Sequence, residues 1–146
     1  MGEERHKDKI VVSNNTRFLS DVRNFISKMV GVSHIPSTEV NKVVLAVDEA
    51  VTNIMEHAYG VNEEGTIEIE VEVDLRQFRV YVRDSGKSFN PDEIKDVDMR
   101  EHVKIGSKKG LGIFLMRQIM DEVRYQFKEG ISNELLLVKY IPHGAE

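Results

Sequence analysis

Acidic and amide side chains recur at helical spacing in the segment AVDEAVTNIMEHAYG, residues 46–60. An α-helix advances about 100° per residue, so Glu49, Asn53 and Glu56 fall within about 60° of one another. They lie roughly opposite an apolar arc that is predicted to pack on the core. The arc consists of Val40, Val43, Val44, Val47, Val51, Ile54 and Ala58. The polar stripe is either the solvated side of this helix or the floor of a site.

Two features of the stripe favour a site. The polar side also carries Leu45, Ala46 and Ala50, which a fully solvated face does not need. After Lys42 the stripe holds only Glu and Asn, whereas a solvated face usually mixes in Lys or Arg. A zinc-protease motif is excluded, because Asn53 stands where the first histidine of the inverted motif would be.

A second segment with possible chemistry is VRDSGKSF, which places Asp84 at the end of a strand and Gly86 just after it. Such a sequence is typical of an ordinary exit from a strand into a turn. The functional alternative is a buried carboxylate at the mouth of a pocket, where it accepts a hydrogen bond from an amino group.

A third segment, GSKKGLGIF, places three glycines with Lys108 and Lys109 at a helix start. Backbone N–H groups at a helix N-terminus are unpaired and carry partial positive charge, so they suit phosphate. The spacing matches neither a Walker loop nor the dinucleotide fingerprint. The segment is therefore either a phosphate-binding helix start or a glycine-rich hinge.

The composition is that of one soluble globular domain. The chain has 146 residues, 40% hydrophobic and 31% charged, and we expect a single domain over 1–146. The absence of cysteine excludes thiol catalysis and Cys-zinc sites. The net charge of −5 disfavours a general nucleic-acid binder. We find no signal peptide and no apolar run near the roughly 18 residues that a membrane span needs, so we expect a cytoplasmic protein.

Periodicity predicts the elements that position these residues. Helices are expected at about 16–30, 37–59 and 111–123, and strands at about 8–14, 66–75, 78–84, 123–128 and 135–141. Helices and antiparallel strands that segregate in this way predict an α+β fold, a two-layer sandwich with a mostly antiparallel sheet covered on one face by helices. Residues 85–110 show almost no periodicity, and a segment this long is more often functional or mobile than structural.

Together the three segments resemble a known family. Their order, from KVVLAVDEAVTNIMEHAYG through VRDSGKSFNPD to KKGLGIFLMRQIMDEV, is similar to the ATP-binding (Bergerat) fold of the GHKL superfamily. Gyrase B, a class of heat-shock chaperones, sensor histidine kinases and MutL share this fold. Within it, the chain most resembles the anti-sigma-factor serine kinases of the RsbW type, over nearly its whole length.

The resemblance implies roles for the residues on the predicted helix and strand. Glu49 would be the general base that takes the proton from the attacking hydroxyl. Asn53 would be the metal ligand, holding the Mg²⁺ that bridges the ATP phosphates. Asp84 would accept a hydrogen bond from the adenine amino group, and Gly86 would allow close approach. His57, one turn after Asn53, either lines the same pocket or is a half-exposed residue at the helix end.

The resemblance also assigns the glycine-rich segment. Residues 85–110 would contain the ATP lid, and Gly110, Leu111 and Gly112 would offer backbone N–H groups to the phosphates. Lys108 and Lys109 stand where some relatives place an arginine. A lysine neutralises charge there but cannot form the bidentate fork of an arginine. Many relatives have a second glycine after Asp-x-Gly, whereas this chain continues with lysine.

The resemblance therefore implies an ATP- and Mg²⁺-dependent protein serine kinase. It would phosphorylate a small anti-sigma-factor antagonist, bind a sigma factor and form a homodimer, without direct nucleic-acid or membrane contact. One alternative is a nucleotide-dependent protein-binding switch of the same fold without kinase activity. Another is a plain α+β interaction domain. Glu49 favours the enzyme, because a pure binder needs no base.

Overall fold

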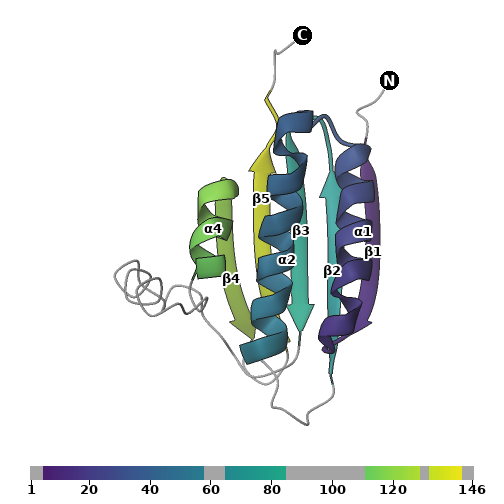
Figure 1. The fold of residues 1–146 in the computed structure, drawn as a ribbon. Helices are drawn as coiled ribbons and strands as arrows, with labels where there is room; N and C mark the ends of the chain where they lie inside the picture. The colour runs from purple at the N-terminus through teal and green to yellow at the C-terminus, as the bar shows by residue number, and fades with distance from the viewer. Residues whose placement is uncertain (1–4, 58–64, 85–110, 129–131, 143–146) are drawn as a thin grey trace.

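The computed structural model describes residues 5–57, 65–84, 111–128 and 132–142. Their elements, in chain order, are β1 (His6–Ser13), η1 (Thr16–Phe18), α1 (Leu19–Gly31), η2 (Ser37–Glu39), α2 (Val40–His57), β2 (Thr66–Val73), β3 (Gln77–Asp84), α4 (Leu111–Ile119), β4 (Glu122–Lys128) and β5 (Ser132–Tyr140). The strands form one sheet in the order β1-β2-β3-β5-β4, and every neighbouring pair is antiparallel. Helices α1, α2 and α4 cover one face of it (Figure 1). The predicted α+β sandwich is confirmed.

Alternating side chains divide the sheet into two faces. In β2 and β3 every second residue is buried under the helices. The intervening residues on the opposite face are half-buried, except Thr66, which is exposed. Val80 and Val82 are fully buried between Val71 and Ile69 of β2 and Leu137 and Leu135 of β5. The core therefore lies between this apolar face and the three helices.

Helix α2 lies in the middle of the helix layer, between α1 and α4 (Figure 1). Its side toward α1 carries Asp48, whose Oδ1 accepts a hydrogen bond from Arg23 Nε of α1 at 2.8 Å. Ala46 and Ala50 lie about 160° around the helix from Asp48, on the side of α4, and both are buried. These alanines looked out of place on a polar face because the sequence does not show that a third helix packs there.

The chain leaves α4 earlier than the periodicity predicts. Apolar spacing extended this helix to residue 123, but it ends at Ile119 and β4 begins at Glu122. The Met120 N–H still bonds the Met116 carbonyl, whereas the Asp121 N–H donates to the Val138 carbonyl of β5 at 2.8 Å. The sheet therefore takes over the backbone hydrogen bonds at this point. Among the described residues, no helix is both long and apolar enough to cross a membrane.

Candidate functional site

Three element ends lie at one end of the sandwich, and the start of α4 faces the same end beside the second half of α2 (Figure 1). The three are the last turns of α2, the end of β3 and the start of β5. Antiparallel pairing of β3 with β5 brings Asp84 opposite Asn133. The predicted stripe on α2 and the predicted carboxylate on β3 therefore share one region, although 27 or more residues separate them in the chain.

Asp84 is a buried carboxylate, with 6% of its surface exposed. The Asn133 side chain, 4% exposed, donates a hydrogen bond from Nδ2 to Asp84 Oδ1 at 3.0 Å. A buried carboxylate is tolerated only when hydrogen bonds replace its hydration. Asn133 therefore restrains the orientation of the Asp84 carboxylate.

Asn133 is a residue of the candidate site that the sequence prediction missed. The predicted strand began at about residue 135, whereas β5 begins at Ser132. Within β5, Asn133 occupies the same face as Leu135 and Leu137, which point into the core. An asparagine in register with buried leucines was the available signal, because a polar residue at such a position needs a buried partner.

Asn53 presents an unsatisfied amide. Its Nδ2 is buried and has no hydrogen-bond partner among the described residues. An unsatisfied buried polar group costs about 1–3 kcal/mol, so its persistence calls for an explanation. An amide can exchange its N and O positions by rotation, so this side chain can offer a ligand either a donor or an acceptor oxygen.

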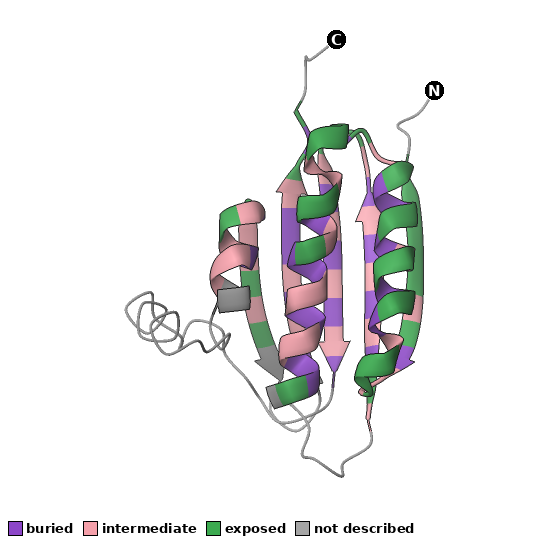
Figure 2. Cartoon of the chain, in the orientation of Figure 1, coloured by how far each residue is buried: buried purple, intermediate pink, exposed green. Residues whose placement is uncertain are grey.

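The outward face of α2 changes along its length. In the first half Asn41, Lys42 and Leu45 are exposed, whereas Glu49 and Asn53 in the second half are half-buried. Figure 2 shows the same helix passing from mostly exposed first turns to half-buried turns further along. Asn53 lies about 140° around the helix from Asp48, toward α4, and Glu49 lies one turn before it. This half of the helix is therefore not a plain solvated face. Glu56 is exposed.

The remaining predicted residues lie at the limits of the described ranges or outside them. His57 is the last residue of α2, and its side chain lies outside the described part. Leu111 and Gly112 open α4, and their backbone is helical. Gly86, Lys108, Lys109 and Gly110, with the predicted lid over 85–110, fall outside the described residues.

The donor set around Asn53 fits a metal that phosphates help to hold. In the described ranges no cluster of three or more His, Cys, Asp or Glu side chains is present. Magnesium bound with nucleotide phosphates takes only one or two ligands from the protein and fills the rest with phosphate oxygens and water. The amide oxygen of Asn53 can be such a ligand.

The fold is that of an ATP-binding sandwich of the histidine-kinase class. A solved histidine kinase domain, from the blue-light-activated histidine kinase of Erythrobacter litoralis EL346, superposes with a TM-score of 0.54 at 19% identity. The match covers 85% of this chain and 59% of that one, and at this identity it shows the fold alone. The chain belongs to the family of histidine kinase-like ATPase domains, whose model matches residues 12–139.

Curated relatives carry a more specific name. The chain is 34% identical to the serine-protein kinase RsbW of Listeria monocytogenes over 106 residues, which is 70% of this chain and 66%, just under two thirds, of that relative. It is 29% identical to the serine-protein kinase RsbW of Staphylococcus aureus over 135 residues, 89% of this chain and 84% of that relative. The resemblance noted in the sequence is confirmed.

Proposed function

We propose that this chain is an ATP- and Mg²⁺-dependent protein serine kinase that acts as an anti-sigma regulatory factor. It would phosphorylate a small antagonist protein and, as the resemblance implies, also bind a sigma factor as a homodimer. The proposal rests on one observation. Glu49 lies one turn before Asn53, whose buried amide nitrogen has no partner among the described residues, and Asp84 is buried toward the same end of the molecule. The names of the relatives supply the reaction class.

The proposed mechanism assigns the nucleotide to the end of the sandwich where α2, α4, β3 and β5 meet. Asp84, held by Asn133, accepts a hydrogen bond from the adenine amino group. A guanine presents a carbonyl oxygen at the same place, so the carboxylate favours adenine. The first N–H groups of α4, at Leu111 and Gly112, have no intrahelical partner and suit the phosphates.

The transfer step uses the second half of α2. Asn53 would hold Mg²⁺ through its amide oxygen, and the metal would neutralise phosphate charge when bound. Glu49 accepts the proton of the substrate serine hydroxyl. As the serine oxygen forms a bond to the γ-phosphorus, the bond between that phosphorus and the leaving oxygen of ADP breaks. Phosphoryl transfer needs mainly positioning and charge neutralisation, so one base and one metal ligand on a rigid helix are sufficient.

The test compares Glu49→Ala with the control Glu56→Ala, which changes an exposed glutamate two turns further along α2. A general base contributes about 10²- to 10⁴-fold to the rate. We expect Glu49→Ala to keep its affinity for Mg-ATP within about threefold and to lose transfer of labelled phosphate to antagonist proteins by at least 10²-fold. The control should transfer at the wild-type rate.

Each other outcome has a defined meaning. Equal transfer rates for Glu49→Ala and the wild type would show that Glu49 is not the base. A wild-type protein that binds Mg-ATP but transfers no phosphate to any antagonist would be a nucleotide-dependent switch. A wild-type protein whose melting temperature does not rise with Mg-ATP would be neither a kinase nor a nucleotide-dependent switch, because a ligand that binds the native state must stabilise it.

A further inference from the structure

Lys139 is a charged residue at an inward position of β5. It follows Leu137 and precedes Ile141 on the helix-covered face, and both neighbours are buried. Only 16% of the Lys139 side chain is exposed. An aliphatic residue would suit this position better, because removing an ammonium group from water is costly unless partners replace the water. Places where a sequence breaks its own pattern are often functional.

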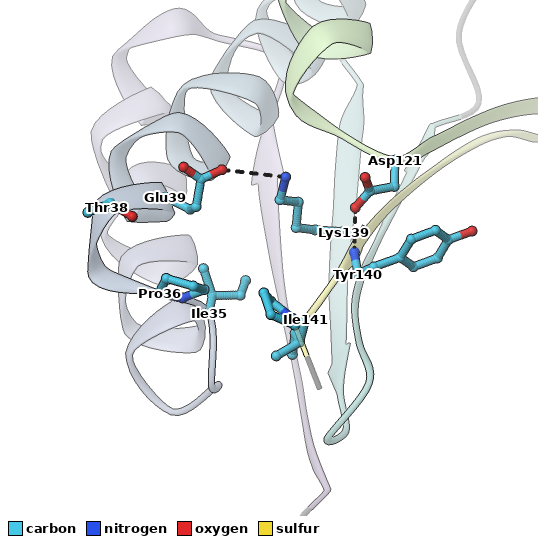
Figure 3. A pocket seen from close by; sticks show the side chains of 9 residues that line it. Ile35, Pro36, Thr38, Glu39, Asp121, Lys139, Tyr140 and Ile141 are labelled. Atoms are coloured by element: carbon cyan, nitrogen blue, oxygen red, sulfur yellow. Dashed lines mark hydrogen bonds and ion pairs between the residues drawn. The ribbon is translucent and has the colours of Figure 1, made fainter. Parts of the chain in front are cut away.

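The ammonium group of Lys139 joins the ends of two helices. Its Nζ donates a hydrogen bond to the carbonyl oxygen of Ile119, the last residue of α4, at 2.9 Å. The same Nζ lies 3.6 Å from Oε1 of Glu39, directly before the start of α2 (Figure 3). A lysine at a helix C-terminus satisfies a carbonyl that the helix leaves unpaired and complements its dipole. Lys139 therefore ties the end of α4 to the start of α2.

Two further hydrogen bonds fix the same exit from α4. The Asp121 N–H donates to the Val138 carbonyl at 2.8 Å, and the Tyr140 N–H donates to Asp121 Oδ2 at 2.6 Å (Figure 3). The C-terminal end of α4 is thus anchored to β5, while its other end begins at the candidate nucleotide site. A helix of nine residues is about 13 Å long, so a tilt of about 4° around the anchor moves its first residue by about 1 Å.

We propose that Lys139 is a positioning residue for phosphoryl transfer. By holding the C-terminal end of α4 against the start of α2, it sets where the first N–H groups of α4 lie relative to Glu49 and Asn53. The residue touches neither substrate nor metal and acts only through α4. The inference rests on the proposed function, because it needs phosphates at the start of α4. A displacement of about 1 Å at a reacting centre can lower a rate by about 10²-fold.

The test compares Lys139→Met, Lys139→Arg and Lys42→Met. Methionine keeps the length and apolar contacts of the lysine stem and removes its charge. Arginine restores a positive charge at this position. Its guanidinium group is larger than the ammonium group, but a groove of about 390 Å³ beside Lys139 can accommodate it. Ile35, Pro36 and Asp121 form part of the groove lining. Lys42 is the matched control: its Nζ lies 3.3 Å from Oε2 of the same Glu39. Lys42 is exposed, and among the described residues it has no hydrogen bond or ion pair with α4.

We expect Lys139→Met to melt within about 5 °C of the wild type, because the methionine suits the apolar surroundings. Its kcat for phosphate transfer should fall by about 10-fold or more, and its dissociation constant for Mg-ATP should rise by only about threefold. Lys139→Arg should recover kcat to within about threefold of the wild type, and Lys42→Met should match it. A role of Lys139 in stability alone would not lower kcat while leaving the melting temperature and the affinity for Mg-ATP nearly unchanged.

The proposal would be overturned by a Lys139→Met protein whose kcat stays within twofold of the wild type, or by an equal loss in Lys42→Met. It would also be overturned if kcat fell only in proportion to the folded fraction. Wild-type activity is measured first, so a failure of the proposed function is seen separately. If the wild type binds Mg-ATP but transfers no phosphate, the proposal is judged by the affinity for Mg-ATP instead of kcat. An unchanged dissociation constant in Lys139→Met then overturns the inference.

Discussion

At the scale of single residues, the site combines one satisfied and one unsatisfied polar side chain. Asp84 is held by Asn133, whereas Asn53 has a buried amide nitrogen that finds no partner among the described residues. A group that lowers stability in the free protein persists when a ligand uses it, because function and stability are then in competition. The buried amide of Asn53 therefore supports the proposed ligand site on α2.

This competition predicts the behaviour of Asn53→Ala. Removal of the unsatisfied amide should leave the free energy of unfolding of the nucleotide-free protein within about 1 kcal/mol of the wild type. The stabilisation by Mg-ATP, about 2.7 kcal/mol at a concentration 100 times the dissociation constant, should be lost. Thermal melting with and without Mg-ATP measures both effects. An undiminished shift in the variant would remove Asn53 from the site.

At the scale of elements, α2 serves the core and the site with different faces. Val47 and Val51 are completely buried toward the sheet, whereas Glu49 and Asn53 lie on the opposite side and toward α4. A helix fixed on the sheet and between two other helices has little freedom to rotate. The core face therefore determines where the polar stripe points, which is what the proposed roles of Glu49 and Asn53 require.

The same division predicts unequal effects of two aliphatic truncations in α2. Val51→Ala should lower the free energy of unfolding by about 2 kcal/mol, because it removes buried methyl groups and leaves a cavity. Leu45→Ala, at a position that is 40% exposed, should change it by less than about 0.5 kcal/mol. Urea denaturation measures both. Equal losses would mean that Leu45 is covered in solution, for example by a second subunit.

At the scale of the whole molecule, the helix-free face of the sheet is crossed by ion pairs rather than left to solvent. Arg83 of β3 reaches carboxylates on both neighbouring strands: Nη1 lies 2.7 Å from Glu68 Oε2 and 2.9 Å from Glu70 Oε1, and Nε lies 2.7 Å from Glu134 Oε2. The pKa of Glu70 lies below its ordinary value of 4.5, mainly because Arg83 donates a hydrogen bond to the carboxylate. Burial raises this pKa, and the charge of Lys7 lowers it further.

These pKa relations predict an acid-dependent effect of Arg83→Met. A carboxyl whose pKa is lowered by folding stabilises the protein above its unfolded pKa, and this contribution is lost as the pH falls through the folded pKa. The variant should therefore lose about 2 kcal/mol of unfolding free energy at pH 7, and the difference should narrow below about pH 4.5 as the carboxyls become protonated. Urea denaturation between pH 3 and pH 7 measures it.

The control for this effect is Arg124→Met on the same face. Arg124 pairs with Glu122 at an exposed position, and exposed pairs contribute about 0–1 kcal/mol. Its loss should change the stability little at any pH. A constant difference between Arg83→Met and the wild type from pH 3 to pH 7 would mean that Arg83 acts through packing and not through charge.

Much of the fold could be predicted from the sequence. Period-2 alternation in residues 66–73 and 77–84 and the valine arc of α2 follow from which atoms each element must bury, so local patterns were sufficient. The end of α4 was predicted too late, because apolar spacing continues past Ile119 while the backbone turns into the sheet. Asn133 was missed because its role depends on a partner 49 residues away.

The sequence by itself determined which residues could do chemistry: Glu49 and Asn53 share a helix face, and Asp84 ends a strand, because side-chain direction follows from the local backbone period. The tertiary structure decided what surrounds them. Only the packing of α4 beside α2 and the pairing of β5 with β3 place Asn53 toward α4 and Asn133 against Asp84. The physical reason is that burial and hydrogen-bond partners are properties of contacts between distant segments, which no local pattern contains.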